Sequence, residues 1–306
     1  MPDLISFRSD GLTLQGALYK PDGAGPFPTL LYNHGSAPGM LNQQAFEELG
    51  PLFIQRGWVF FAPYRRGQGH SAAAGPFIGD EIAAAGTLRA CIGSAIAVLS
   101  VFLFLFVVVR KRRRRTRAAW GLGLAVVAAV TVRLSAAQAS AATMVRLLET
   151  DHFNDQRAAF KWLEQQSFVE KSKMATAGNS FGGVQAVLGA ERLGYCAAVD
   201  AAGGAESWAV AGELRTLMTR AVRGARAPIL FFQAENDYDI SPSLMLASEM
   251  QSAGKPFDLN IYPAFGRSAS EGHSFAWAGS AVWADDVFRF LSAKCSLGQR
   301  SERPDR

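Results

Sequence analysis

The chain has 306 residues, of which 49% are apolar and 19% are charged. This composition excludes a globally disordered protein and allows either one large domain or two small ones. The net charge of +5 depends on seven basic residues between positions 110 and 117, and without them the rest of the chain would carry −2. The basic character is therefore local, and a nucleic-acid-binding surface spread over the protein is not expected.

The cysteines and the N-terminus carry little functional signal. Cys91, Cys196 and Cys295 are far apart and odd in number, so they predict no disulfide framework. Cys196 is expected to pack as a small apolar side chain. The first residues, MPDLISFRSDG, lack a basic segment followed by an apolar core, so they do not predict a signal peptide.

The first part of the chain predicts a β-hairpin followed by alternating elements. Residues 5–21 form two candidate strands joined at Ser9-Asp10-Gly11, which is a turn signal. A strand, a helix and a strand are then expected at residues 29–32, 42–57 and 58–67.

The alternation resumes after a long apolar and basic segment. A long amphipathic helix is expected over residues 143–166. Beyond it, strands are expected at 173–180, 195–204, 228–237 and 257–266, and helices at 181–194, 206–224, 241–255 and 280–294. This order predicts a mostly parallel sheet covered on both faces, with the first hairpin as an antiparallel edge.

Ser180 lies between glycines where a predicted strand meets a predicted helix. Residues 178–182 have the Gly-x-Ser-x-Gly pattern of a nucleophile elbow, in which the glycines make room for a sharp turn. Such a turn holds the serine in a strained conformation and projects its hydroxyl above the sheet. The N-terminus of the following helix points backbone N–H groups at a developing oxyanion. The structural alternative is a glycine-rich turn without catalytic function.

A nucleophilic serine needs a base, and histidine suits that task near neutral pH. The chain has four histidines. His273 follows the last predicted strand, in what we expect to be a long loop from which it could reach across the strand ends. Structural roles are favoured for His34, His70 and His152, and His152 is expected to face solvent from its amphipathic helix.

The base in turn needs an acid that fixes its tautomer. The strand ending near residue 237 offers Glu235, Asp237 and Asp239. Asp237 is favoured because it lies at the strand-to-helix turn. Asp239 is expected to cap the helix that begins near Pro242, although Ser241 competes for that role.

The order Ser180, Asp237, His273 and the loop Asn33-His34-Gly35-Ser36 resemble the α/β-hydrolase superfamily. They are most similar to its dienelactone hydrolase and prolyl oligopeptidase-like branch, and the resemblance covers residues 1–84 and 143–295. It implies the α/β-hydrolase fold, a mostly parallel doubly wound sheet, here with an N-terminal antiparallel hairpin and an inserted apolar helical hairpin. It also implies that the backbone N–H groups of Phe181 and Ser36 form the oxyanion hole.

The resemblance also narrows the chemistry. Residues 64–71, Tyr-Arg-Arg-Gly-Gln-Gly-His-Ser, match the family's glycine-rich loop after the fourth strand, although a plain turn stabilised by Arg65 or Arg66 is the favoured interpretation. Dienelactone hydrolases proper use a cysteine nucleophile, so Ser180 favours an ordinary carboxylic ester as substrate. Prolyl oligopeptidases carry a propeller domain for which this chain has no room, which weakens a peptidase interpretation.

The expected reaction is acyl transfer to water through an acyl-enzyme. Ser180 attacks the carbonyl carbon with His273 as base, and His273 then protonates the leaving alcohol. No cofactor is expected, and no cluster of His, Cys or acidic residues has metal-ligand spacing.

The segment between the two parts predicts a pair of apolar helices. Residues 92–109 are 18 uncharged residues, which as a helix span about 27 Å, and residues 118–132 are 15 more, or about 22 Å. A single span would divide the sheet between two sides of a membrane, so the choice is two spans or none. Two spans place the basic tip in the cytoplasm and the hydrolase on the far side, which conflicts with the missing signal peptide. A lid or interfacial hairpin, and an artefactual insertion, remain as alternatives.

The expected organisation therefore has two parts of one hydrolase domain, an insertion and a tail, at residues 1–84 and 143–295, 85–142 and 296–306. The expected function is a serine hydrolase that cleaves small-molecule carboxylic esters and contacts a membrane through residues 92–132. Alternatives are a non-catalytic hydrolase-fold binding module anchored by the hairpin, an acyltransferase or peptidase with the same triad, and a cytoplasmic location. Nucleic-acid binding is not expected, and the sequence is silent on the oligomeric state.

Overall fold

The computed structural model describes residues 1–36, 43–109 and 114–297, and for Gln43, 97–99, 101–109, 114–125 and Leu297 it describes the backbone alone. The chain divides into two compact units. We call residues 1–77 and 147–306 the sheet unit, and residues 78–146 the helical hairpin.

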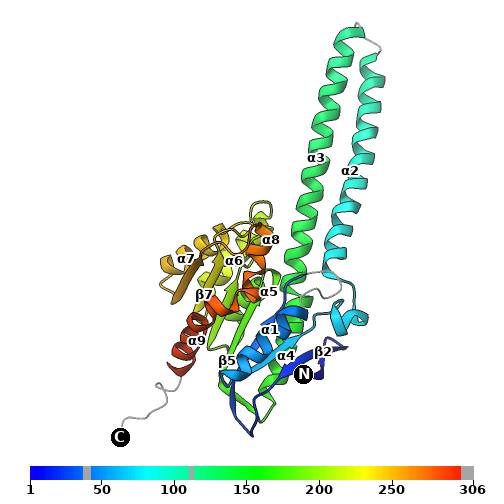
Figure 1. The fold of residues 1–306 in the computed structure, drawn as a ribbon. Coiled ribbons are helices and arrows are strands. Elements are labelled where there is room, and N and C mark those ends of the chain that lie inside the picture. The colour runs from blue at the N-terminus through cyan, green and yellow to red at the C-terminus, as the bar shows by residue number, and fades with distance from the viewer. Residues whose placement is uncertain (37–42, 110–113, 298–306) are drawn as a thin grey trace. The chain divides into compact units, whose positions relative to one another are not determined.

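The sheet unit contains one eight-stranded sheet in the order β1-β2-β4-β3-β5-β6-β7-β8 (Figure 1). β1 pairs with β2 and β2 with β4 in antiparallel fashion, and the other neighbouring pairs are parallel. The predicted fold class, a mostly parallel sheet with an N-terminal antiparallel hairpin, is confirmed. The strands are β1 Asp3–Ser9, β2 Leu12–Tyr19, β3 Phe27–Asn33, β4 Val59–Pro63, β5 Val169–Asn179, β6 Ala197–Ala201, β7 Ile229–Ala234 and β8 Phe257–Tyr262.

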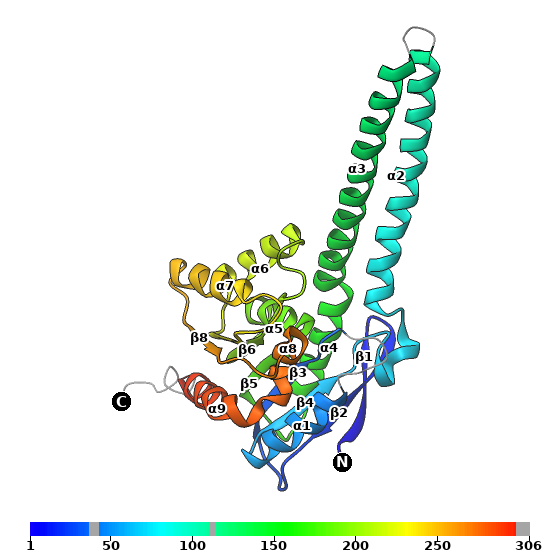
Figure 2. The ribbon, with the colours of Figure 1, turned by 45° about the horizontal axis from the view of Figure 1, so that its top comes forward.

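Helices cover both faces of this sheet. They are α1 Gln43–Gln55, α4 Asp151–Glu164, α5 Phe181–Arg192, α6 Gly212–Gly224, α7 Ser241–Ser252, α8 Ala269–Ala278 and α9 Ser280–Leu297, and a 3-10 helix η2 spans Gly69–Ala74. β4, β6 and β7 are buried along their whole length, as expected for strands covered on both sides, whereas edge strand β1 alternates between exposed and buried positions. Figure 2 shows α1 and α9 on one face of the sheet and α4 and α5 on the other.

The core follows from the two-residue period of the strands. Phe60 packs on the face covered by α1 and α9, near Phe53, whose ring lies 4.7 Å from that of Phe288. The next residue, Phe61, points to the opposite face, where its ring lies 5.0 Å from that of Trp162 in α4. The burial of each such ring contributes about 1.5–3 kcal/mol to the stability of the fold, so apolar packing holds the helices on both faces of the sheet.

Two helical predictions need correction. The single helix expected over residues 143–166 is broken at Thr150, because α3 ends at Glu149 and α4 begins at Asp151. The stretch expected to be a long loop before the last helix contains α8, which begins with a capping box. The side chain of Ser268 accepts a hydrogen bond from the N–H of Glu271, and the Glu271 carboxylate accepts one from the Ser268 hydroxyl.

The cysteine prediction was also wrong. Cys196 and Cys295 form a disulfide with a Cα–Cα distance of 4.9 Å, although 99 positions separate them. α9 crosses the face of the sheet beside the start of β6, and this tertiary contact, which spacing along the chain does not reveal, brings the two thiols together. Cys91, in the helical hairpin, is free and exposed.

The helical hairpin consists of α2, Ile78–Val109, and α3, Arg114–Glu149, whose last three residues belong to the sheet unit. The two helices approach closely at glycines: a Cβ on Gly86 would meet the Ser140 side chain, and one on Gly93 would meet Val132. Hydrogen bonds from Arg89 to Ser135 (2.9 Å) and from Ser140 to the Ile82 carbonyl (3.1 Å) join them. α2 and α3 therefore pack against each other as an antiparallel pair along this stretch.

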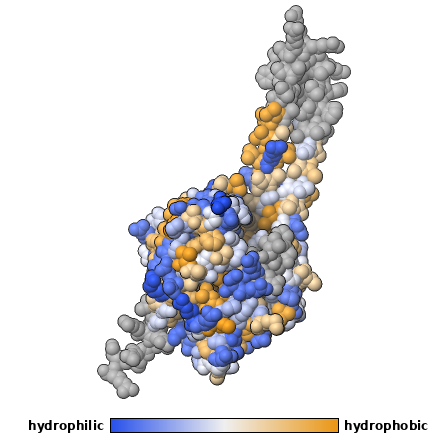
Figure 3. All heavy atoms as spheres, viewed as in Figure 1, coloured by the Kyte–Doolittle hydropathy of each residue, from blue (hydrophilic) through white to orange (hydrophobic). Residues whose placement is uncertain are grey.

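The outer surface of the helical hairpin is apolar. Its exposed large hydrophobic side chains include Leu88, Ile92, Ile96, Val126, Val127, Val130 and Leu134. The coloured part of the hairpin in Figure 3 carries orange, hydrophobic patches. Within the described residues, one candidate is long and apolar enough to cross a membrane by length and composition; it is the stretch Val126–Glu164, which runs from α3 past the break at Thr150 into α4. The predicted first span, 92–109, is helical, but most of its side chains and the basic residues 110–113 lie outside the described residues.

Candidate active site

Ser180 occupies a strained turn at the carboxyl edge of the sheet. It lies between the last residue of β5 and the first residue of α5, with φ 55° and ψ −120°. For a residue with a Cβ atom such a conformation costs about 1–3 kcal/mol, and it persists only where the surroundings enforce it. Hydrogen bonds from the Ser180 N–H to the Ala201 carbonyl (2.9 Å) and from the Gly183 N–H to the Ser180 carbonyl (3.0 Å) hold this backbone in place.

The glycines around Ser180 are required by space. A Cβ on Gly178 would lie against the Gly182 carbonyl, and one on Gly182 would lie against the Asn33 carbonyl. A Cβ on Gly183 would meet the carboxylate of Asp200. The turn is thus packed from both neighbouring strands, which matches the geometry expected of a nucleophile elbow.

His273 and Asp237 meet although they are 36 residues apart. The Nδ1 atom of His273 lies 2.8 Å from Oδ1 of Asp237, and the Asp237 side chain is almost fully buried. Two further donors fix the carboxylate: the Gln233 amide at 3.0 Å and the Tyr238 N–H at 2.6 Å. The imidazole ring also packs edge-on against Tyr238. Asp237 is therefore an oriented acceptor for one nitrogen of His273.

His273 is held on a helix, whereas the sequence predicted a loop. It lies in α8, whose residue Gly272 packs against the backbone of Asn236 at the end of β7, where a Cβ would collide. The Asn236 amide donates to the carbonyls of Phe265 and Ser268 and so ties the segment before α8 to the end of β7. This packing places His273 beside Asp237, the residue that follows Asn236.

The other two candidate acids, Asp239 and Glu235, lie in different surroundings. Asp239 accepts a hydrogen bond from the Ser241 N–H at 2.8 Å, immediately before α7. Glu235 is exposed. Of the three candidate acids, Asp237 is the one that the structure places against His273.

The other three histidines differ from one another in burial and in the residues that they contact. His34 is fully buried, and the Arg65 backbone N–H donates to its Nε2 atom at 3.3 Å. His70 is exposed and contacts Tyr64. His152 was expected to face solvent, but it is 1% exposed and packs edge-on against Phe181, because α4 starts afresh after Thr150. Burial and the nearby arginines hold the pKa of both His34 and His152 well below the usual range, so neither is a cation at neutral pH.

The expected oxyanion donors lie on two segments that meet at this edge. Phe181 is the first residue of α5, so its N–H has no partner within the helix. Ser36 follows the loop after β3 and is exposed, and residues 37–42 beyond it lie outside the described residues. The two segments are linked, since the Gly35 N–H donates to the side chain of Asn179 at 3.0 Å. In the described part of the chain, no group of three or more His, Cys, Asp or Glu residues could hold a metal ion.

This geometry can be compared with known proteins. The sequence profile of the dienelactone hydrolase family matches residues 124–292, which is more than half of the chain. The chain belongs to the dienelactone hydrolase family. A search of curated proteins found no match.

Solved structures agree with this dienelactone hydrolase family fold. The Pyrococcus horikoshii acylaminoacyl peptidase aligns with a TM-score of 0.53 at 16% identity, over 89% of this chain and 38% of that one. The chain thus spans well under half of the peptidase. Two esterases align along most of both chains: Thermogutta terrifontis esterase 2 (TM-score 0.54, 14% identity, 94% and 94%) and a Pyrococcus furiosus esterase (0.59, 10%, 96% and 91%). At identities this low, the TM-scores show that these proteins and this chain share a fold.

The sequence analysis missed two buried polar residues of this family member. Gln233 donates to Asp237 and to the Asp239 carbonyl, and it accepts from the Ser243 hydroxyl, so it braces the candidate acid. Asp200, on β6, accepts from the Gly203 N–H, and burial raises its pKa to about 7. The sequence signal for each was a single polar residue inside an otherwise apolar predicted strand, Gln233 in FFQA and Asp200 in AAVD.

Proposed function

We propose that the protein is a serine esterase that hydrolyses carboxylic esters through an acyl-enzyme, with Ser180, His273 and Asp237 as its triad. The observation that carries the proposal is the hydrogen-bonded His273–Asp237 pair at the edge of the sheet where the strained Ser180 also lies. Membership in a hydrolase family and similarity in fold to proteins named as esterases support it.

In this proposal each residue has one task. The Ser180 hydroxyl attacks the ester carbonyl carbon and gives its proton to Nε2 of His273. Asp237 accepts the Nδ1–H of His273, which fixes the tautomer and stabilises the imidazolium. The N–H groups of Phe181 and Ser36 bind the oxyanion. His273 then protonates the leaving alcohol, and a water molecule activated by the same base releases the acid.

Turnover of p-nitrophenyl esters with acyl chains of 2 to 10 carbons tests the proposal. Ser180→Ala should reduce kcat/KM at least about 10³-fold, because the residual rate comes from binding and the oxyanion donors alone. Ser172→Ala, which changes an exposed serine on the same strand, is the matched control and should keep the wild-type rate. A fluorophosphonate probe should label the wild type and the control but not Ser180→Ala.

Equal turnover by Ser180→Ala and wild type would exclude the triad as drawn. The same assay with matching p-nitroanilides measures amide cleavage, which an acylaminoacyl peptidase-like activity requires. Turnover of anilides at rates similar to esters would favour the peptidase alternative, and ester transfer to an added alcohol in preference to water would favour an acyltransferase.

We further propose that the helical hairpin anchors the esterase in a membrane, with the sheet unit on the side opposite to the basic tip. The exposed apolar side chains of the helical hairpin support membrane contact. The basic run at positions 110–117 favours a cytoplasmic tip. The Cys196–Cys295 disulfide is the kind of bond that persists outside the cytoplasm, which favours the same orientation.

A membrane-impermeant maleimide applied to intact cells tests this orientation. In a Cys91→Ala background, Lys171→Cys, an exposed position of the sheet unit, should be labelled, and Arg115→Cys at the tip should be labelled only after the membrane is permeabilised. The opposite pattern would reverse the orientation. Recovery of the protein in the soluble fraction would exclude anchoring.

A further inference from the structure

Arg65 is a buried cation directly behind the loop that carries one expected oxyanion donor. It lies just after β4 and is 3% exposed. Its Nη2 atom donates to the Gly35 carbonyl at 2.6 Å, and its backbone N–H donates to Nε2 of His34. Because Nε2 of His34 accepts this bond, its proton is on Nδ1, which lies 2.7 Å from the same Gly35 carbonyl. Two donors therefore hold the Gly35 carbonyl.

The geometry of the peptide bond makes this clamp relevant to catalysis. The Gly35 carbonyl and the Ser36 N–H belong to one planar trans peptide group, so they point in opposite directions. Fixing the carbonyl toward Arg65 fixes the Ser36 N–H on the other side. A cation that binds the carbonyl also polarises the peptide, which makes its N–H a stronger hydrogen-bond donor.

Arg65 also contacts the segment that carries the second donor. Its guanidinium lies over the ring of Phe181, 4.6 Å from the centroid. Its Nη1 atom donates to the Gln185 side chain at 2.6 Å, one turn further along α5. Gln185 in turn donates to the His152 carbonyl. One side chain thus joins the loop after β3 to the first turn of α5.

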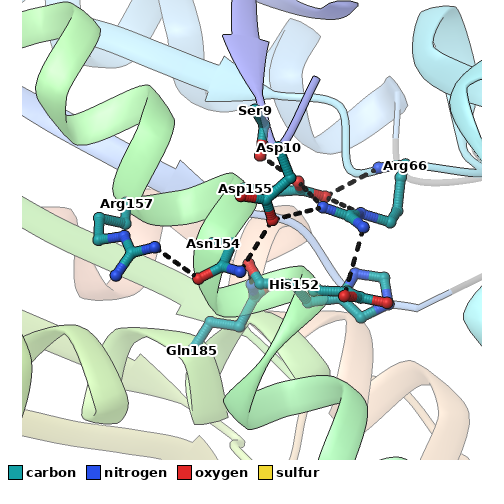
Figure 4. Close-up of polar contacts among 9 residues, drawn as sticks. Ser9, Asp10, Arg66, His152, Asn154, Asp155, Arg157 and Gln185 are labelled. Carbon is teal, nitrogen blue, oxygen red and sulfur yellow. Dashed lines mark hydrogen bonds and ion pairs between the residues drawn. The ribbon is translucent and has the colours of Figure 1, made fainter. Parts of the chain in front are cut away.

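The neighbouring Arg66 shows what a purely structural arginine looks like in this protein. It is 8% exposed and pairs with Asp155 at 2.6 Å and Asp10 at 3.5 Å (Figure 4), and with Asp151 at 3.4 Å. Figure 4 also shows Asp155 joined to Ser9, so this network ties β1 to α4. By contrast, among the described residues the polar contacts of the Arg65 guanidinium are with neutral groups, namely the Gly35 carbonyl, the side chains of Gln68 and Gln185, and the ring of His34. Arg65 forms no ion pair like those of Arg66 among the described residues, and Asp155 acts on its charge only through space.

We propose that Arg65 is a positioning residue of the oxyanion hole, which aligns and polarises the Ser36 N–H through the Gly35 carbonyl and braces the Phe181 segment. The positive charge of Arg65 acts on the negative charge that develops in the transition state and has little effect on the neutral ester. Burial lowers the pKa of the Arg65 guanidinium to about 9, which still leaves it charged at neutral pH. The inference rests on the proposed esterase function and adds a residue to it.

The test compares Arg65→Met and Arg65→Lys with Arg66→Met as the matched control. The measured quantities are kcat and KM for a p-nitrophenyl ester, per active site titrated with a fluorophosphonate, and Ki for an aryl trifluoromethyl ketone. That ketone forms a tetrahedral adduct whose oxyanion occupies the same hole. Arg65→Met should lower kcat 10- to 1,000-fold, raise Ki by a similar factor and change KM less than about 3-fold. Arg65→Lys should recover part of both losses.

Arg66→Met should lower the melting temperature and leave kcat per site and Ki within about 3-fold of wild type. If Arg65→Met keeps kcat per site and Ki within that range, or if Arg66→Met loses as much as Arg65→Met, Arg65 is only structural and the proposal fails. If Arg65→Met does not fold, Arg65→Lys decides by the same readouts, with a parallel change of at least 3-fold in kcat and Ki expected. A wild type that neither cleaves esters nor reacts with the fluorophosphonate overturns the esterase function and this inference together.

Discussion

The sheet unit and the helical hairpin use apolar residues in opposite ways. In the sheet unit, strands such as β4 and β7 are buried along their whole length, and their side chains are covered by helices on both faces. In the helical hairpin, side chains as apolar as Val127 and Leu134 are more than half exposed in the part of the chain that the structure describes. Hydrophobicity alone therefore does not locate the core. Helices cover the apolar faces of the sheet, whereas these side chains of the helical hairpin are exposed.

The proposed triad lies in the sheet unit, so the largest expected effect is there. Asp237→Asn should lower kcat about 10³- to 10⁴-fold, because an amide cannot hold the tautomer of His273 or stabilise its imidazolium. Asp239→Asn, whose side chain can still accept from the Ser241 N–H, should stay within about 3-fold of wild type. Steady-state kinetics on a p-nitrophenyl ester measures both. If the two variants lose activity equally, the assignment of Asp237 as the acid is wrong.

Two leucines, one in the sheet unit and one in the helical hairpin, test the comparison between the two units. Leu30, on β3, is fully buried, whereas Leu134, on α3, is 61% exposed. Leu30→Ala should lower the free energy of unfolding by about 2–5 kcal/mol, since it leaves a cavity in the core. Leu134→Ala should change it by less than about 0.5 kcal/mol. Urea denaturation in detergent measures both, and a large loss in Leu134→Ala would mean that the helical hairpin has a packed partner of its own.

The most gradual expected effect is a change in how the stability of the sheet unit depends on pH, because it is spread over about three pH units. The pKa of Asp200 is raised from its ordinary value of 3.8 to about 7 by burial, so the native state binds this proton more tightly than the unfolded chain does. The stabilisation is fully present below pH 3.8 and is lost as the pH rises to about 7. The slope is at most about 1.4 kcal/mol per pH unit.

Asp200→Asn should remove that slope and keep the acceptor for the Gly203 N–H. Melting temperatures between pH 4 and 8 measure the difference, and Asp258→Asn, which changes an exposed aspartate of the same sheet, is the control. Parallel curves for wild type and Asp200→Asn would show that the proton on Asp200 does not contribute.

Local patterns in the sequence predicted most of the elements of the sheet unit. The alternation of strands and helices, the turn at Ser9-Asp10-Gly11 and the Gly-x-Ser-x-Gly segment depend on neighbouring residues, and each corresponds to an element of the structure. The failures involve contacts between distant segments. The disulfide between Cys196 and Cys295, the burial of His152 and the placement of His273 on α8 all depend on which helix packs against which strand.

The residues of the candidate site also differ in whether a local sequence pattern predicts them. Ser180, His273 and Asp237 were chosen from the sequence because few residues can act as nucleophile, base and acid, and because their order along the chain is typical of this family. Gln233, which donates to Asp237 from only four residues upstream, and Arg65, which donates to the Gly35 carbonyl from the loop after β4, carry no local motif.

The sequence by itself determined the alternation of elements, the strained serine turn and the two apolar helices, because these depend on the period of apolar residues and on glycines within a few positions of one another. Only the tertiary structure decided which carboxylate meets His273, which cysteines pair and which arginine stands behind the oxyanion loop. Those outcomes depend on the order of strands in the sheet, which brings together residues more than 30 positions apart.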